Sequence, residues 1–224
     1  MIKITLDKNL DKETFLNFFE LKAGGVDFGE KIIKSHPTVS KDNYQEYIND
    51  YYDKNKEELT KSLLEINNLA QQKQADFFNA IKDIFKQDFS SKEYCGTLSI
   101  FDCNPRYLDK NIFQVYYKRS NQDKLRVVFH EVLHFIFFDY CRANLGGIVN
   151  GMDQNKGKYW DLSEIFNVIV LNQPPFQKIL KKRENIFYPK HKEIYSTIEK
   201  IWRKSNRDMK RFISESLVVL PEIL

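Results

Sequence analysis

Hydrophobic residues recur along the chain with two different periods, and these periods predict both strands and helices. Ile2, Ile4 and Leu6 alternate with polar residues, which is the pattern of a short half-buried strand. Between residues 56 and 86, apolar residues recur mostly every three, four or seven positions, which predicts a long amphipathic helix. A break of this helix near Asn67 is left open.

The middle of the chain combines two strand-like runs with one strongly apolar helix. Residues 97–101 and 112–117 are rich in Ile, Phe, Val and Tyr and predict a β-hairpin with a long connection. Residues 125–140 are apolar nearly all round, which is typical of a helix buried in a domain. Ser120 and Asp123 form the capping pattern that begins this helix.

The remaining pattern is helical, and it places the chain in the α+β class with a mostly helical content. The further helices that we expect cover residues 12–22, 43–52, 162–171, 176–182, 189–204 and 206–219, the last capped by Ser205, while residues 28–40 are ambiguous. We predict one domain over residues 1–224. It has a mainly helical part at 1–90, a hairpin and two helices at 91–172, and carboxy-terminal helices at 173–224.

Composition excludes several classes of protein. The 35 Lys and Arg against 31 Asp and Glu leave a net charge of only +4, which does not favour direct nucleic-acid binding. Three cysteines without CxxC spacing favour neither a disulfide scaffold nor a thiolate zinc site, and they predict a reducing compartment. Residues 127–138 are too short a run to span a bilayer, and the first residues lack a signal-peptide pattern. We therefore expect a cytoplasmic protein without a membrane partner; its oligomeric state is left open.

The predicted buried helix carries an HExxH sequence. His130 and His134 are four residues apart, so both imidazoles lie on one face of a helix and can bind one Zn²⁺ ion. Glu131 is rotated away from that pair and can instead take a proton from a metal-activated water. This pattern predicts metal-assisted amide hydrolysis with Glu131 as general base and one zinc ion per chain.

A catalytic zinc site needs a third protein ligand. The HExxHxxGxxH continuation is excluded, because Phe137 and Tyr140 occupy its glycine and histidine positions. Glu164, near the start of the next apolar helix, is the ligand that we predict, with Asp161 and then His191 as alternatives. The competing interpretation is that Glu164 is a first-turn acidic residue favoured by the helix dipole, with Ser163 or Asp161 as the cap.

These residues resemble the gluzincin branch of the zincin metallopeptidases. In that group HExxH is followed by a glutamate ligand in an ExxN or ExxA context, which Glu164-Ile165-Phe166-Asn167 matches. The resemblance implies a zincin-like fold with a small sheet before the HExxH helix and a peptide or protein substrate. It also implies that the strand at 112–117 forms the rim that pairs with an extended substrate. Residues 171–174 add a likeness to small metallopeptidases that cleave phage or stress-response repressors, although the amino-terminal half has no helix-turn-helix signature.

Such sites use a further donor for the oxyanion, and Tyr188 and His191 are our candidates. Both lie at the start of a predicted helix, where surface tyrosine and histidine are also common. Two alternatives to a peptidase remain. One is a non-catalytic zincin-like protein with an interaction or regulatory role. The other is a helical interaction domain with an accidental HExxH, in which Glu131 pairs with a cation such as Arg126 or Arg142.

Overall fold

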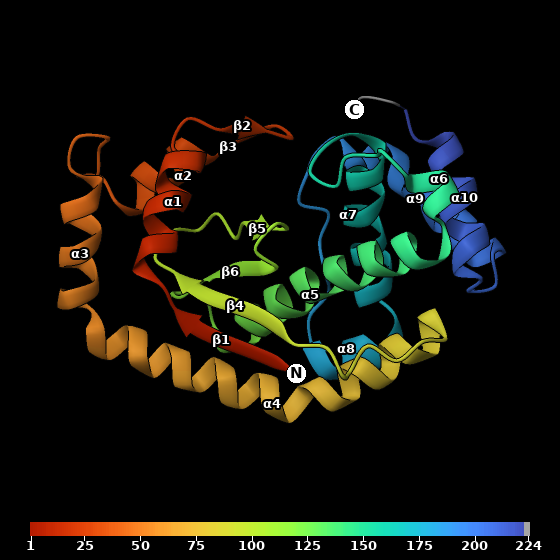
Figure 1. The fold of residues 1–224 in the computed structure, drawn as a ribbon, viewed down its shortest axis with the longest axis horizontal. Coiled ribbons are helices and arrows are strands. Elements are labelled where there is room, and N and C mark those ends of the chain that lie inside the picture. Colours follow the sequence, from red (N-terminus) through yellow and green to blue (C-terminus); the bar gives the residue numbers. More distant parts are fainter. Residues whose placement is uncertain (222–224) are drawn as a thin grey trace. The chain divides into compact units, whose positions relative to one another are not determined.

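The computed structural model describes residues 1–221, and within them it has a mostly helical α+β architecture, as the sequence predicts (Figure 1). Its helices are α1 (Lys8–Phe18), α2 (Phe28–Ser35), α3 (Tyr44–Lys54), α4 (Lys56–Phe85), α5 (Asn121–Asn144), α6 (Gly146–Val149), α7 (Gly157–Leu171), α8 (Pro174–Leu180), α9 (His191–Lys204) and α10 (Met209–Val219). Its strands are β1 (Ile2–Leu6), β2 (Lys22–Ala23), β3 (Val26–Asp27), β4 (Tyr94–Ser99), β5 (Arg106–Tyr107) and β6 (Ile112–Tyr116).

The chain forms two compact units. Unit 1 comprises Met1–Ala75 with Ser91–Glu131, and unit 2 comprises Asp76–Ser90 with Val132–Leu224. Helices α4 and α5 each contribute residues to both units. The single domain expected over 1–224 stays a prediction, and the last three residues of its predicted part 173–224 lie outside the described residues.

Unit 1 contains a four-stranded sheet in the order β1-β4-β6-β5. Strands β1, β4 and β6 are mutually parallel, and only β5 runs antiparallel, against β6. The predicted hairpin is therefore wrong, because β4 and β6 pair in parallel through a connection that contains β5. Gly96 helps this pairing: a Cβ atom there would lie 2.6 Å from the ring of its partner Phe113.

The strand β6 cannot be the substrate-pairing rim that the family resemblance implies. Its register with β4 covers its whole length, and β5 pairs with Ile112 and Phe113 on its other side. Beyond β5, the amide of Gln114 donates to the carbonyl of Pro105 at 2.8 Å, and the amide of Tyr116 donates to Asn104 Oδ1 at 3.0 Å. Both edges of β6 are thus occupied, and the outer strand on this side of the sheet is β5.

Helix α4 is continuous, so the break considered near Asn67 does not occur. The side chain of Asn67 instead accepts from the amide of Ile4 at 3.0 Å and donates to its carbonyl at 2.8 Å. Gln74 accepts from the amide of Ile2 at 3.0 Å. Amide side chains of α4 thereby satisfy backbone groups of the edge strand β1, alongside which α4 runs in Figure 1.

Several predicted boundaries are corrected by local turn and cap chemistry. Helix α1 begins at Lys8, capped by Asp7, and ends before the predicted position, because β2 and β3 form a hairpin. The connecting residues Gly24 and Gly25 have φ values of 59° and 81°, which a tight two-residue hairpin turn requires. Helix α2 occupies part of the ambiguous stretch and ends where Pro37 follows His36.

The carboxy-terminal helices are also shifted relative to prediction. Helix α7 begins at Gly157, five residues earlier than expected. Helix α10 is capped by Asp208, which accepts from the amide of Arg211 at 3.1 Å, whereas the predicted cap Ser205 ends α9. The cap expected for α5 is confirmed, because Ser120 Oγ accepts from the amide of Asp123 at 3.2 Å.

The core of unit 2 is aromatic and centres on Phe166 of α7, which is fully buried. Its ring centroid lies 5.0 Å from Phe137, 5.7 Å from Phe85, 5.8 Å from Phe212 and 5.9 Å from Trp202. These rings come from α4, α5, α7, α9 and α10. The cluster therefore fixes α7 against the half of α5 that belongs to unit 2.

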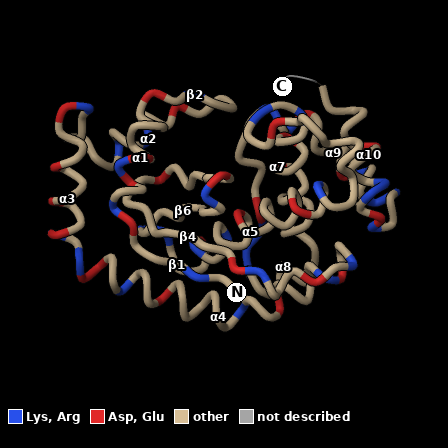
Figure 2. Tube along the Cα trace, in the orientation of Figure 1, with Lys and Arg blue, Asp and Glu red and all other residues tan. Residues whose placement is uncertain are grey.

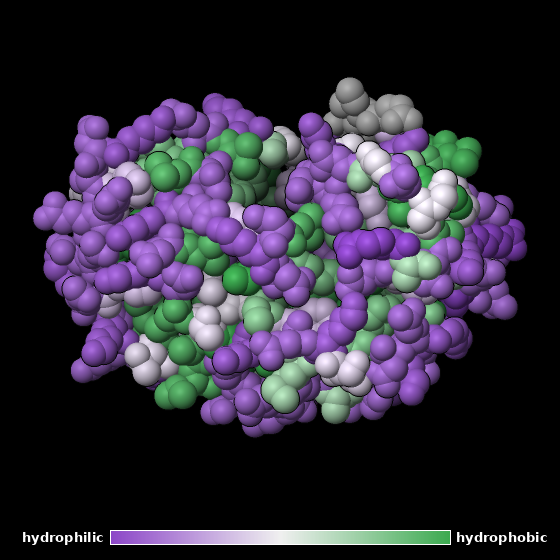
Figure 3. All heavy atoms as spheres, in the orientation of Figure 1, coloured by the Kyte–Doolittle hydropathy of each residue, from purple (hydrophilic) through white to green (hydrophobic). Residues whose placement is uncertain are grey.

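Charged side chains of both signs are distributed along the described part of the chain. Lys and Arg alternate with Asp and Glu along the trace in Figure 2, and the face in Figure 3 is largely hydrophilic with separate hydrophobic areas. Among residues 1–221, no helix combines the length and apolar character needed to cross a membrane. The three cysteines are free thiols, with Cys103 and Cys141 buried and Cys95 half-buried.

Candidate metal centre

The HExxH residues lie in the middle of α5, as predicted. Helical geometry puts His130 and His134 one turn apart on the same face, with Glu131 displaced to the side. His134 is fully buried, Glu131 is 6% exposed, and His130 is half-buried. Polar side chains at this depth need polar partners, because burying them without any would cost several kcal/mol.

Glu164 lies in the middle of α7 and faces the same site. Its Oε1 atom is 3.3 Å from Nε2 of His134, and the residue is 9% exposed. Because α7 begins at Gly157, Glu164 is about two turns inside the helix, beyond the first turn where the helix dipole favours acidic residues. Neither Ser163 nor Asp161 caps this helix. The helix-dipole interpretation of Glu164 therefore does not account for its position.

One ligand atom from each of His130, His134 and Glu164 lies within 4.8 Å of the other two. Ligand atoms bound tetrahedrally to zinc at about 2.0–2.1 Å are about 3.3 Å apart. The separation between Nε2 of His134 and Oε1 of Glu164 already equals that value, and the ligand atom of His130 lies within 4.8 Å of both. Two imidazoles and one carboxylate form the donor set of a catalytic zinc site with an open fourth position. The residues present therefore fit a zinc ion.

Glu131 contacts an arginine from the sheet of unit 1. Nη1 of Arg106 on β5 lies 3.4 Å from Oε2 of Glu131, and the two side chains are only 7% and 9% exposed. The cations named as possible partners from the sequence form other ion pairs: Arg126 with Asp123 at 3.8 Å and Arg142 with Asp139 at 3.5 Å. Sequence inspection did not identify Arg106, since nothing in a two-residue strand 25 positions earlier indicates this contact.

The alternative ligands Asp161 and His191 contact each other outside the three-residue group. His191 Nε2 lies 2.6 Å from Asp161 Oδ1, and Lys190 Nζ lies 3.1 Å from the same oxygen. Asp161 is one turn before Glu164 on α7, and it is fully buried. Among the described residues, the structure thus brings Glu164 to the two histidines and gives Asp161 a different partner.

Tyr188 belongs to the same cluster as His191. Its ring centroid is 5.3 Å from that of His191 and 4.9 Å from that of Trp160. His191 is buried at the first position of α9, and Tyr188 is half-buried. The two oxyanion candidates are therefore held together against the beginning of α7, the helix that carries Glu164.

Comparisons with known proteins found no relative of this chain. No protein-family model matches the sequence, no curated protein matches it, and no solved structure matches its fold. The function is therefore inferred from the chemistry of the site.

Proposed function

We propose that this protein is a zinc-dependent metallopeptidase, similar to the gluzincins, that hydrolyses peptide bonds with Glu131 as general base. The observation that carries the proposal is the meeting of His130 and His134 with Glu164, a residue 30 positions further along the chain. A zincin-like fold and one zinc ion per chain belong to the same proposal. The complete donor set and the adjacent acidic side chain support it.

The residues of the chain divide the work of amide hydrolysis between them. His130, His134 and Glu164 would hold the ion, and zinc so bound would supply a Lewis acid that polarises the peptide carbonyl and activates water. Glu131 accepts the proton of the attacking water and then delivers it to the nitrogen of the leaving amine. The carboxylate begins and ends the cycle unprotonated, so the proton balance closes.

Tyr188 and His191 are the proposed donors to the oxyanion. The contact with Asp161 fixes the orientation of the His191 ring, and an oriented ring is what a histidine needs to present its other nitrogen in a constant direction. The phenol of Tyr188 is the second candidate. A peptide or a protein is the proposed substrate, and the three free cysteines are compatible with a reducing, cytoplasmic compartment.

The deciding experiment measures zinc per chain in the wild type, Glu164→Ala and Glu184→Ala, all purified without a metal-affinity step. Glu184 is the matched control, because it is a glutamate of the same unit with 8% exposure against 9% for Glu164. We expect about one zinc per chain in the wild type and the control and a sharp loss in Glu164→Ala. Circular dichroism then checks that each variant is folded.

Three other outcomes of these measurements would change the proposal. Absence of zinc from the wild type after incubation with zinc at neutral pH would refute the proposal and favour a helical interaction protein. If Glu164→Ala retained zinc, the third zinc ligand would be Asp161 or His191 instead of Glu164. Zinc-loaded wild type that cleaves no member of a peptide library, with the same result for Glu131→Gln, would favour a non-catalytic zincin-like protein.

A further inference from the structure

Arg106 is the charged residue of β5, the outer strand on one side of the sheet. Strand β5 pairs antiparallel with β6, with Arg106 opposite Phe113 and Tyr107 opposite Ile112. Successive side chains of a strand point to opposite faces, so Arg106 and Tyr107 leave the sheet in opposite directions. Arg106 contacts Glu131 of α5, and both residues belong to unit 1.

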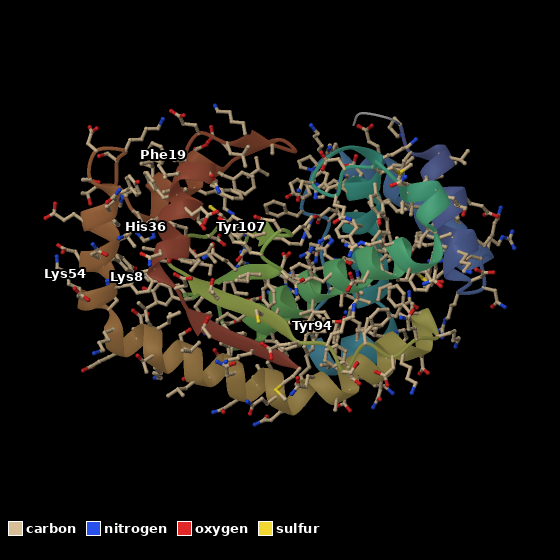
Figure 4. All side chains as sticks on the ribbon, in the orientation of Figure 1. Lys8, Phe19, His36, Lys54, Tyr94 and Tyr107 are labelled. Carbon is tan, nitrogen blue, oxygen red and sulfur yellow. The ribbon has the colours of Figure 1, made fainter. Side chains whose placement is uncertain are left out.

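The strand is anchored on the face opposite Arg106. Tyr107, labelled in Figure 4, has its hydroxyl 2.8 Å from Thr14 Oγ of α1. Lys110, which follows the strand, forms an ion pair with Glu13 of the same helix. These contacts tie β5 to α1, so the backbone of Arg106 is held by the fold independently of Glu131.

A buried ion pair at this position is weak evidence for a role in stability. Two charges that are only 7% and 9% exposed lose most of their hydration, and their attraction compensates for that loss only when the geometry is excellent. A contact of 3.4 Å is longer than the 2.7–2.9 Å of a strong charge-assisted hydrogen bond. Replacement of such pairs by apolar residues is often neutral for stability, so the pair calls for an explanation other than stability.

We infer that Arg106 is the positioning residue for the general base, holding the Glu131 carboxylate through Oε2 so that its other oxygen is directed at the attacking water. This inference rests on the proposed peptidase function. A glutamate side chain has three rotatable bonds, and a base must be held within a fraction of an ångström and a few tens of degrees of its productive geometry. The planar guanidinium, fixed on a strand, restricts that rotation.

The test compares Arg106→Met and Arg106→Lys with the control Arg119→Met. Arg119 is an arginine of the same unit that pairs with Asp102, so the control also removes one cation and one ion pair. Zinc per chain, kcat and KM are measured on the zinc-loaded protein with a peptide that the wild type cleaves. We expect Arg106→Met to bind zinc normally and to lose about 10- to 100-fold in kcat with KM little changed, because only base positioning is lost.

Guanidinium rescue of kcat separates positioning from a structural role, and a double-mutant comparison of stability checks that the two residues interact. Added guanidinium, far below denaturing concentrations, is expected to restore part of the kcat of Arg106→Met, and Arg106→Lys is expected to be intermediate. Added guanidinium should leave the kcat of Arg119→Met unchanged. In the metal-free protein, Arg106→Met and Glu131→Gln together should lower the unfolding midpoint by less than the sum of their separate effects, because each removes the same contact.

The remaining outcomes overturn either the role of Arg106 alone or the peptidase proposal as well. Unchanged kcat in Arg106→Met, or additive effects on the unfolding midpoint, overturns the inference while the peptidase proposal stands. A raised KM at constant kcat overturns it in favour of substrate binding by Arg106. Wild type that holds no zinc or cleaves no peptide removes the peptidase proposal itself, and the inference fails with it.

Discussion

Replacing Asp11 with asparagine is expected to remove a pH dependence of stability that this one carboxyl group gives to unit 1. Asp11 on α1 is fully buried. Its oxygens accept from Ser99 Oγ at 2.5 Å, Tyr52 Oη at 2.8 Å, the amide of Ile100 at 3.0 Å and Gln114 Nε2 at 3.1 Å. The cluster joins α1 and α3 to the sheet.

Burial raises the pKa of Asp11 from 3.8 to about 6, although hydrogen bonds from Ser99, Ile100, Tyr52 and Gln114 act in the opposite direction. The folded state therefore holds this proton up to about pH 6, whereas the unfolded state releases it near pH 4. Between these values the folded state binds more protons, so the free energy of unfolding falls as the pH rises. A pKa raised by about 2 corresponds to a decrease of about 3 kcal/mol in the free energy of unfolding. This decrease is complete above the folded-state pKa of about 6.

The assay is urea denaturation of the wild type and Asp11→Asn across this pH range, followed by far-ultraviolet circular dichroism. Both tryptophans, Trp160 and Trp202, lie in unit 2, so tryptophan fluorescence reports separately on the unit that lacks Asp11. Asparagine does not titrate, so its own contribution to stability is the same at every pH, and the difference between the two pH slopes isolates the titration of Asp11. Identical slopes for both proteins would refute this account of Asp11.

Three further outcomes are expected. Phe166→Ala should lower the free energy of unfolding by about 3–5 kcal/mol, measured by urea denaturation, because it removes a fully buried ring from the core of unit 2; a loss below about 1 kcal/mol would contradict the described packing. Ellman's reagent at about pH 8 should modify Cys95 alone in the native protein and all three cysteines in urea, because burial raises the pKa of the two buried thiols to about 12; rapid reaction of more than one native thiol would be inconsistent with that burial. Tyr188→Phe or His191→Ala should reduce kcat of the zinc-loaded protein, and unchanged turnover in both would exclude the pair as oxyanion donors.

Local patterns in the sequence determined most of the helices, although not α2 or α6, and the two histidines of the candidate site. The spacing of His130 and His134 fixes their relation because a helix repeats every 3.6 residues, whatever surrounds it. Apolar periodicity likewise predicted β1 and α4, and the Ser120 cap predicted where α5 begins. Boundaries were less predictable where a turn intervened. The Gly24-Gly25 hairpin ended α1 early because a turn with two positive φ angles competes with continuation of the helix.

Only the tertiary structure decided which distant residues meet. Two strand-like runs joined by a long loop can pair in either direction, and here β4 and β6 pair in parallel while β5 pairs antiparallel with β6. Glu164 meets His134 because aromatic packing around Phe166 fixes α7 against α5, while Asp161, one turn away, meets His191 instead. Arg106 reaches Glu131 through the strand order of the sheet. Sequence periodicity records which face of an element is buried, but the partner on that face depends on how whole elements pack.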